Sequence, residues 1–359
     1  MSITLPSANE NTPVGQPTPP TRVAVVGYGY WGVNYVRVFN EMPDASLAVV
    51  CDADIDRLSE VKRRLTHVEV SDDFERVLDD PTIDAVVIAT PATTHFDLTK
   101  RALVAGKHVL VEKPLTTEST TAAELVELSE TLGRLLMVGH TFLYNEGIRV
   151  AKQFVEHGVY YLYSRRTCLG PIRNDVNAAW DLATHDVSIF NYLLDAEPQW
   201  VAAVGAKVLR NGHEDVSFIT MGYPNGVVGH IHVSWADPNK VREVVIVCRD
   251  RRVVFNDMDS LERVRVFERG VERETGPLGF GEQLSLRDGD ILSPAIDARE
   301  PLKAQCGHFL HCIRRGQMLR TDARQGLAVV RVIEAVNRSM ELAGAPVQLG
   351  SNGQGGVSA

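Results

Sequence analysis

The sequence has little of what marks a nucleic-acid-binding, secreted or membrane protein. Basic residues are outnumbered, since 37 Lys and Arg against 46 Asp and Glu give the 359-residue chain a formal charge of -9. This balance argues against electrostatic binding to nucleic acid or to an anionic membrane. The first 20 residues hold five prolines but no basic segment followed by an apolar run, so we expect neither a signal peptide nor a membrane span.

Cysteine is also scarce. The cysteines are odd in number, scattered and without a CxxC pair, which favours reduced thiols and a cytoplasmic location. They are Cys51, Cys168, Cys248, Cys306 and Cys312. No zinc-site spacing is present: His230 and His232 share one strand face, but two ligands are too few, and His308 and His311 are equally unremarkable. We therefore expect no metal.

The length predicts more than one domain, because a single hydrophobic core usually stops growing at about 250 to 300 residues. A hydrophobic content of 44% with 23% charged residues is typical of a soluble globular chain. We expect a dinucleotide-binding domain at 22–140 and a substrate and oligomerisation domain at 141–345, whose last helices pack back on the first. Residues 1–21 and 346–359 are predicted to be a disordered and a flexible tail.

Strands and helices alternate in the first half of the chain. Buried strands are predicted at 22–27, 46–52, 67–70, 85–90 and 108–112, with a helix over 31–42 and helical patterns between several of the other strands. This alternation predicts an α/β domain of the Rossmann type, with a doubly wound parallel sheet covered by helices on both faces.

A glycine-rich turn, GYGYWG, lies between the first strand and the first helix. Gly27, Gly29 and Gly32 have the GxGxxG spacing, which allows a tight turn, close approach to a pyrophosphate and close helix packing. Asp52 ends the next strand, where a carboxylate binds the adenosine ribose hydroxyls and repels a 2′-phosphate, although an ordinary strand-end carboxylate is the plainer alternative. The pattern favours NAD over NADP, unless Arg57 folds back toward this position.

The second half of the chain has a different pattern of predicted strands and helices. Strands joined mostly by short turns are predicted at 160–167, 200–208, 215–222, 227–235, 242–249, 251–257 and 261–268. Consecutive strands with short connections predict a C-terminal α+β domain built on a large, mainly antiparallel open sheet. Helices are expected at 145–158, before this sheet, and at 301–316 and 322–344, after it.

The segment AWDLATHDVSIFNYLLD, residues 179–195, forms an amphipathic helix in this reading, with one apolar stripe. Asp181 and His185 are four residues apart and lie together away from that stripe, where they could face a cleft. An N-cap role for Asp181 and a satisfied surface histidine are the plainer alternatives. Asp186 falls within the stripe, where a buried carboxylate needs a partner.

The stretch HVLVEKP, residues 108–114, ends a buried strand on a charged pair, Glu112 and Lys113. The carboxyl end of a parallel strand opens onto the ligand crevice of such a sheet, so these side chains are expected where cofactor and substrate meet. A solvated lysine at a strand end is the alternative. The strand aims Lys113 into the crevice.

These motifs resemble the glucose-fructose oxidoreductase / inositol dehydrogenase (Gfo/Idh/MocA) family of NAD(P)-dependent enzymes. The resemblance extends from about Arg22 to about Gly344, and the EKP sequence is more specific than the glycine turn. It rests on GYGYWG, TPATTH (90–95), AGKHVLVEKPL (105–115) and DLATH (181–185). The family often has Gly and Asp where this chain has Ala183 and Ser188.

The resemblance implies a catalytic set made of Lys113, often on a cis peptide to Pro114, with Asp181 and His185. It also implies a set of residues that bind the cofactor: Gly27, Tyr28, Gly29, Tyr30, Trp31, Gly32, Asp52, Thr90, Pro91, His95, Glu112 and Lys113. Two segments, VGHTFLYN (138–145) and CLGPIRND (168–175), are similar to the nucleotide-sugar 3-dehydrogenase branch. They add His140, Asn145 and Arg173 to the substrate-binding candidates, with Lys113, Asp181 and His185; an exposed loop arginine is the alternative for Arg173.

The chemistry that follows is hydride transfer between nicotinamide and a secondary alcohol or ketone, at C3 in that branch, of a sugar or nucleotide sugar. A base takes the hydroxyl proton as hydride leaves the same carbon. His185 is the preferred base and Lys113 stabilises the reacting oxygen or shuttles the proton, while Asp181 orients the imidazole or a substrate hydroxyl. The sequence does not separate the lysine and histidine roles.

Other functions are open on the same fold. They are a glycosidase that uses bound NAD in a closed redox cycle, an inositol or other polyol dehydrogenase, and a non-catalytic NAD-sensing regulator. Intact Lys113 and His185 argue against the regulator. The resemblance also implies a homodimer or homotetramer, because such sheets pack face to face between subunits.

Overall fold

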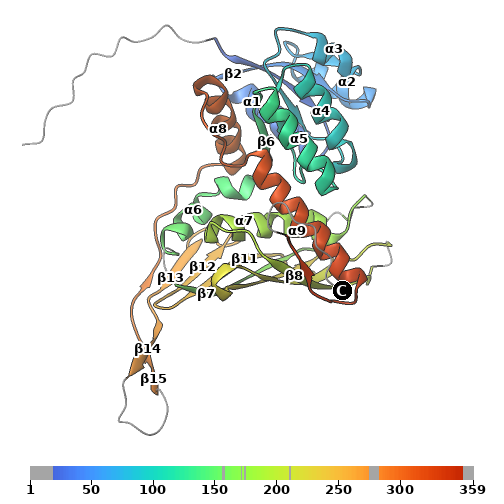
Figure 1. Ribbon diagram of the computed structural model, residues 1–359. Helices are drawn as coiled ribbons and strands as arrows, with labels where there is room; N and C mark the ends of the chain where they lie inside the picture. The colour runs from blue at the N-terminus through green and yellow to red at the C-terminus, as the bar shows by residue number, and fades with distance from the viewer. Residues whose placement is uncertain are drawn as a thin grey trace, which may run out of the picture.

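A computed structural model describes residues 19–155, 158–170, 172–173, 175–209, 212–274 and 283–350. The tails predicted at 1–21 and 346–359 lie largely outside these residues. Where the structure describes these predicted tails, they are partly ordered. The first strand begins at Thr21, and Val347–Gln348 form a short edge strand, β17, that pairs with β8 (Trp200–Ala206). The chain folds around two sheets that lie one above the other in Figure 1, with helices between and around them.

The upper sheet is the parallel sheet that the alternating pattern predicts. Its strand order is β3-β2-β1-β4-β5-β6, and every neighbouring pair is parallel. Its strands are β1 Thr21–Val26, β2 Ala45–Cys51, β3 Glu69–Ser71, β4 Ala85–Ile88, β5 His108–Val111 and β6 Leu136–Val138. The strand β6 is not predicted from the sequence, because three apolar residues are too few to show a period.

Helices cover both faces of this sheet, which explains why its strands read as continuous apolar runs. Along β1, Val23 and Val25 enter one buried cluster with α1, whereas Ala24 and Val26 enter the cluster on the opposite face. The helices are α1 Gly32–Glu41, α2 Ile55–Arg64, α3 Phe74–Asp79, α4 His95–Val104 and α5 Ser119–Thr131, with the 3-10 turn η1 Ala92–Thr94 before α4. Asp54 and Asp73 cap α2 and α3 through their side chains.

The lower sheet has nine strands in the order β16-β13-β12-β11-β7-β10-β9-β8-β17. All neighbours are antiparallel except β7 and β10, so the predicted, mainly antiparallel sheet is confirmed with one parallel pair. The remaining strands are β7 Val159–Thr167, β9 Val216–Gly222, β10 Val228–Ser234, β11 Val241–Cys248, β12 Arg252–Asn256, β13 Val264–Phe267 and β16 Ile291–Leu292. A separate hairpin, β14 Gly270–Glu274 and β15 Gln283–Arg287, projects beyond the sheet (Figure 1).

The remaining helices lie between the two sheets or beside the first sheet (Figure 1). They are η2 Thr141–Tyr144, α6 Glu146–Gln153, η3 Ala179–Ala183, α7 Thr184–Leu194, α8 Pro301–Arg315 and α9 Ala323–Glu341; the short turn η4 Pro224–Gly226 joins β9 and β10. The last two helices connect the two halves, since α8 packs against α1 and η2, and α9 against α5, α7 and β8.

The helix predicted at 179–195 begins with a π-helical turn, η3, and continues as the α-helix α7. The carboxylate in its apolar stripe, Asp186, has the partner that burial requires. The Arg166 Nε and Nη2 atoms, from β7, lie 2.7 and 3.2 Å from the two Asp186 oxygens, and the side chains are only 5% and 1% exposed. This ion pair ties α7 to the sheet.

We expect Asp186→Ala to destabilise the protein by about 3 to 5 kcal/mol, because it leaves the buried Arg166 charge without a partner. The measurement is the midpoint of urea unfolding. Glu69→Ala, which removes half of an exposed pair with Arg76, is the matched control and should cost no more than about 1 kcal/mol. Equal midpoints for the two variants would contradict the role of the buried Arg166–Asp186 ion pair in stability.

Candidate active site

The glycine turn between β1 and α1 has the shape that a dinucleotide pyrophosphate requires. Gly27 adopts a φ of +92°, which favours glycine, and a Cβ at Gly32 would lie 1.8 Å from the Gly27 carbonyl oxygen. A Cβ at Gly29 would meet only Arg57 Nη1, at 3.8 Å, so this face of the turn is open. The backbone and the start of α1 therefore fit a phosphate group.

The predicted ribose ligand, Asp52, lies at the end of β2 beside this turn. Its two oxygens accept hydrogen bonds from the Tyr28 and Asp54 backbone N–H groups at 2.5 and 2.9 Å. Arg57 does fold back, because its Nη1 is 3.5 Å from Asp52 Oδ2. Tyr30 and Trp31, the other side chains of the turn, are exposed and meet edge to face.

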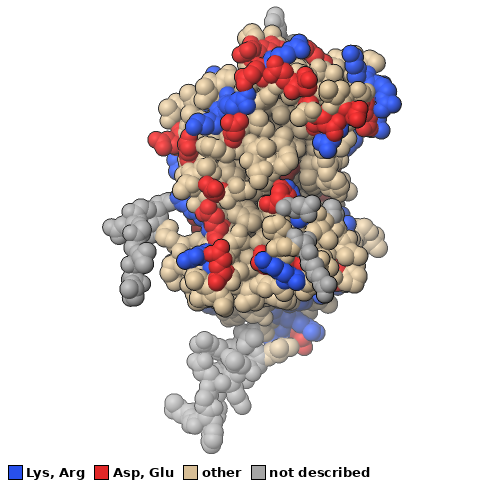
Figure 2. Space-filling model, turned by 90° about the vertical axis from the view of Figure 1, so that its right-hand side faces the viewer, with Lys and Arg blue, Asp and Glu red and all other residues tan. Residues whose placement is uncertain are grey.

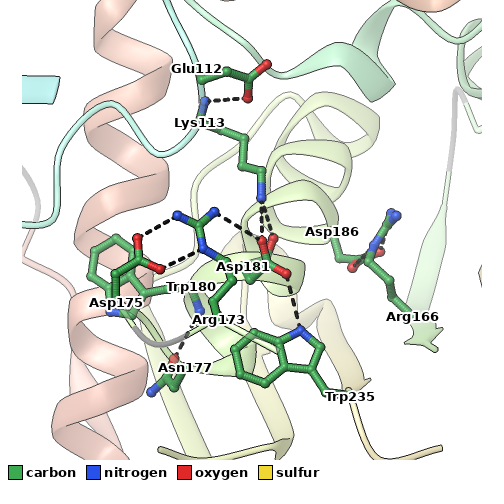
Figure 3. Close-up of polar contacts among 10 residues, drawn as sticks. All are labelled: Glu112, Lys113, Arg166, Arg173, Asp175, Asn177, Trp180, Asp181, Asp186 and Trp235. Atoms are coloured by element: carbon green, nitrogen blue, oxygen red, sulfur yellow. Dashed lines mark hydrogen bonds and ion pairs between the residues drawn. The ribbon is translucent and has the colours of Figure 1, made fainter. Parts of the chain in front are cut away.

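Lys113 lies at the tip of β5, on a cis peptide to Pro114 as the resemblance implies. Its ammonium group reaches into the second domain. There it donates to the Asp181 backbone carbonyl at 2.6 Å and to Asp181 Oδ1 at 3.0 Å (Figure 3). An ammonium group has three N–H donors, so two bonds to one residue leave one N–H for another acceptor.

Asp181 is held from three sides. Besides Lys113, its carboxylate accepts a hydrogen bond from Trp235 Nε1 at 3.2 Å and lies 3.6 Å from Arg173 Nη1 (Figure 3). Burial alone would raise the pKa of this carboxyl, but Lys113 and then Arg173 hold that pKa below its ordinary value. No hydrogen bond joins Asp181 to His185 in the described part of the chain, so this carboxylate orients the lysine and not the imidazole.

Arg173, the predicted substrate ligand, lies beside Lys113 and Asp181. Its guanidinium forms a two-pronged contact with Asp175, at 2.8 and 2.6 Å, in addition to the longer contact with Asp181 (Figure 3). Arg173 is therefore not an exposed arginine without partners, since its side chain is 30% exposed and forms ion pairs with Asp175 and Asp181.

His185 lies in the same site without a polar partner for its Nδ1. The Phe142 ring packs against it with a centroid separation of 5.0 Å, and the Arg166 guanidinium stacks on that ring at 4.2 Å. Burial, and then the positive charges of Lys113 and Arg166, hold the pKa of His185 well below its usual value. The imidazole is therefore neutral at neutral pH, the form that accepts a proton.

His140 is a second buried histidine of this region. It is 1% exposed, neither ring nitrogen has a partner, and burial lowers its pKa from 6.5 to about 3. It lines a cavity of about 1050 Å³ between α7 and α9, with Ser188 and Gln325 among the other lining residues. Lys113 and Asp181 are not among the residues that line this cavity.

Glu112 faces away from Asp181 into a buried polar chain. It accepts hydrogen bonds from the Tyr35 hydroxyl at 2.7 Å and from the Lys113 backbone N–H at 3.1 Å. Gln305, from α8, donates to the same tyrosine and accepts from Thr141. Burial raises the pKa of Glu112 although the Tyr35 bond opposes that rise. This network of hydrogen bonds fixes the backbone from which Lys113 projects.

Three other predicted residues have partners within the protein. His95 is buried, with its ring nitrogens 2.7 Å from the Pro114 carbonyl and 3.0 Å from the Thr90 carbonyl, so it supports the turn that carries Lys113. Asn145 caps α6 and donates to Asp257. Thr90 is half-buried at the end of β4, and Pro91 beside it is exposed.

Sequence reasoning missed Trp235, Phe142 and Arg166. The one available signal was Asp186, whose place in an apolar stripe required a cation without naming it. Within the described ranges, no three His, Cys, Asp or Glu side chains are grouped to hold a metal ion, and no helix is long and apolar enough to cross a bilayer. All five cysteines are free thiols.

Comparison with known families identifies the fold and the NAD-binding domain. Residues 21–140 match the oxidoreductase family with an NAD-binding Rossmann fold, and residues 120–254 match the GFO/IDH/MocA C-terminal domain. The chain belongs to the GFO/IDH/MocA oxidoreductase family, as its motifs predicted. It is an NAD-binding oxidoreductase, and its glycine turn and Asp52 belong to the NAD-binding domain.

Two curated relatives carry specific names. The chain is 26% identical to UDP-N-acetylglucosamine 3-dehydrogenase of Acidithiobacillus ferrooxidans over 324 residues, which cover 89% of this chain and 97% of that protein. It is 33% identical to the NAD-dependent scyllo-inositol 2-dehydrogenase of Bacillus subtilis over 236 residues, 60% and 68% of the two chains.

Solved structures show the same fold over nearly the whole chain. The Acidithiobacillus ferrooxidans enzyme superposes with a TM-score of 0.77 at 25% identity, covering 90% of this chain and 99% of that one. GenD2 of gentamicin A biosynthesis, in complex with NAD, superposes with a TM-score of 0.79 at 22% identity, covering 94% and 98%.

Stability should fall in acid because His140 stays neutral in the folded state. Its pKa drops from 6.5 to about 3 on folding, so between those values the unfolded chain binds more protons and unfolding becomes easier as pH falls. Between pH 7.5 and pH 5, the free energy of unfolding of the wild type should fall by about 2 kcal/mol more than that of the His140→Gln variant. Urea unfolding at both pH values measures this difference.

The His67→Gln variant is the control, since it makes the same substitution at an exposed histidine, whose Nε2 lies 3.0 Å from Asn40 Oδ1. It should keep the wild-type pH dependence. If His140→Gln keeps it too, the buried histidine is not the group that titrates.

Proposed function

We propose that this protein transfers a hydride between NAD and a secondary alcohol or ketone of a sugar or nucleotide sugar, at C3. The observation that carries the proposal is the contact between Lys113, from the NAD-binding domain, and Asp181, from the second domain, beside a neutral imidazole. A nucleotide sugar is favoured because the relative matched over most of both chains is a UDP-sugar 3-dehydrogenase.

The bound nicotinamide supplies the hydride acceptor or donor, and the residues of this chain manage the proton and the oxygen. The free N–H of Lys113 donates to the reacting oxygen and stabilises its developing negative charge. Asp181 holds the ammonium in that position and balances its charge. His185, neutral and with one ring nitrogen unpaired, takes the hydroxyl proton during oxidation and returns it during reduction.

Around this centre, the remaining residues bind and orient. The turn Gly27–Gly32 and Asp52 hold the pyrophosphate and ribose, and Glu112 and His95 act through the Lys113 backbone as positioning residues. Arg173 is the candidate for a substrate phosphate or carboxylate, for which it would exchange part of its contact with Asp175. His140 and Asn145 border the sugar in this proposal.

We further propose a homodimer or homotetramer formed through the face of the nine-stranded sheet that no helix covers in Figure 1. Aromatic side chains with large exposed areas lie along its strands, including Tyr161 and Phe218. A cytoplasmic location fits the free thiols. On the side shown in Figure 2, acidic and basic residues are intermixed over the described surface, which does not favour a nucleic-acid partner.

Lys113→Ala and His185→Ala should each lower turnover by about 100-fold or more while leaving the Kd for NAD within a few-fold of wild type, because both residues act on the reacting oxygen. NADH formation is measured with UDP- and TDP-sugars, free sugars and inositols. Lys100→Ala, which removes an exposed lysine of α4, is the control and should keep full activity.

Full activity in both variants would refute the assignment of the site. Net NADH production by the wild type also excludes the closed redox cycle of a glycosidase and the role of a non-catalytic regulator.

A further inference from the structure

The proposed base, His185, has no partner on its inner side in the described part of the chain. Its Nδ1 atom is buried and forms no hydrogen bond there. A substrate that enters from solvent does not reach a buried atom, so Nε2 is the nitrogen that meets the hydroxyl group. For Nε2 to accept a proton, the neutral ring must carry its N–H on Nδ1. A buried N–H without an acceptor is costly, so this tautomer needs a partner behind the ring.

The polar groups beside His185 on its own helix are engaged elsewhere. The Asp181 carboxylate is bound by the lysine of the EKP motif, and Asp186 is paired with the buried arginine of β7. The Ser188 hydroxyl donates to the His185 backbone carbonyl at 2.7 Å. Thr184 has an unpaired hydroxyl, but adjacent residues of a helix do not face the same side. The partner of Nδ1 therefore comes from another element.

His140 is the candidate that the fold brings near this imidazole. Among the described residues, His140 and His185 are the only histidines with a fully buried ring nitrogen that lacks a hydrogen-bond partner. His140 directly precedes η2, which packs against α7 and whose Phe142 ring lies on the His185 imidazole with a centroid separation of 5.0 Å. After burial and the charges of Lys113 and Arg166, His140 also lowers the pKa of His185, so the two rings lie within electrostatic range.

Water can connect the two rings. No direct hydrogen bond joins the two imidazoles among the described residues. The cavity of about 1050 Å³ is lined by His140 and by Ser188, which lies one turn after His185 on α7. Buried water commonly bridges polar groups that would otherwise lack partners, and this cavity is polar and large enough to supply it. One water molecule between the rings accepts the N–H of His185 and donates to a ring nitrogen of His140.

We propose that His140 is a positioning residue for His185: through one bridging water it holds the N–H on Nδ1 and so fixes the tautomer whose Nε2 takes the substrate proton. This proposal rests on the function proposed above, and it refines the role of His140 from bordering the sugar to acting behind the base. His140 is itself neutral, because burial lowers its pKa to about 3. A neutral partner fixes the tautomer without the negative charge that would raise the pKa of the base.

Nitrogen-15 NMR of the full-length, histidine-labelled protein tests this without a substrate, because the chemical shifts of the ring nitrogens distinguish N–H from unprotonated nitrogen. The signals of His185 are those missing from His185→Gln. We expect the proton on Nδ1 in the wild type, and His140→Leu should shift it toward the Nε2–H form that free histidine prefers. His140→Gln and His140→Asn each replace one ring nitrogen by an amide oxygen, and at least one of them should keep the wild-type tautomer.

Thr99→Val is the matched control. It removes another buried polar group that lacks a partner in the described chain, in α4, and should change neither the tautomer of His185 nor turnover. His140→Leu should lower kcat roughly 10- to 100-fold, the usual effect of removing the partner that orients a functional histidine, and change KM much less. The amide variant that keeps the tautomer should recover most of kcat.

The proposal is overturned if wild-type His185 carries its proton on Nε2, or if His140→Leu leaves the tautomer unchanged. It is also overturned if neither amide variant keeps the tautomer although retained NAD binding shows that both are folded. If the tautomer depends on His140 but the wild type oxidises no sugar, the proposed function fails while the positioning of His185 stands.

Discussion

The site depends on one interaction, the pair formed by Lys113 and Asp181 across the two halves of the molecule. Lys113 is 6% exposed and comes from the carboxyl end of a parallel strand, whereas Asp181 is 19% exposed and comes from the π-helical turn before α7. Each charge would be costly to bury alone. The pair therefore holds an ammonium group, with one N–H donor left over, between the NAD-binding domain and the C-terminal domain.

The surrounding charges are arranged in pairs and leave the histidines neutral. Arg166 is paired with Asp186, and Arg173 with Asp175 and Asp181. Burial of the imidazoles, and then the nearby cations, disfavour protonation of His185 and His140. One centre thus combines a paired ammonium group with an uncharged imidazole, which is the combination that the proposed oxidation of an alcohol requires.

Local sequence patterns predicted the fold class. A parallel sheet covered on both faces has strands that are continuously apolar, whereas an antiparallel sheet has consecutive strands joined by short turns. The GYGYWG turn and the EKP strand end likewise followed from strand and helix context. The contacts of the site were less accessible. Trp235 and Arg166 come from strands of the second sheet, about 50 and 20 residues from Asp181 and Asp186, and no local period indicates such pairings.

The contacts of Asp181 and Arg57 have physical causes that arise only in the folded chain. Asp181 and His185 are four residues apart, yet the turn that begins their helix is π-helical and the carboxylate turns to Lys113 and Trp235 instead of the imidazole. Arg57 approaches Asp52 because α2 starts directly after β2. Both pairings depend on side-chain directions that sequence spacing does not fix.

The most direct test of the central claim is a crystal structure of the protein with NADH and a bound sugar substrate or product. The account predicts that Lys113 Nζ and a His185 ring nitrogen both lie within hydrogen-bond reach, about 2.6 to 3.2 Å, of the oxygen on the carbon that faces the nicotinamide. A complex in which the amine and the imidazole face apart, or in which neither approaches that oxygen, would contradict it.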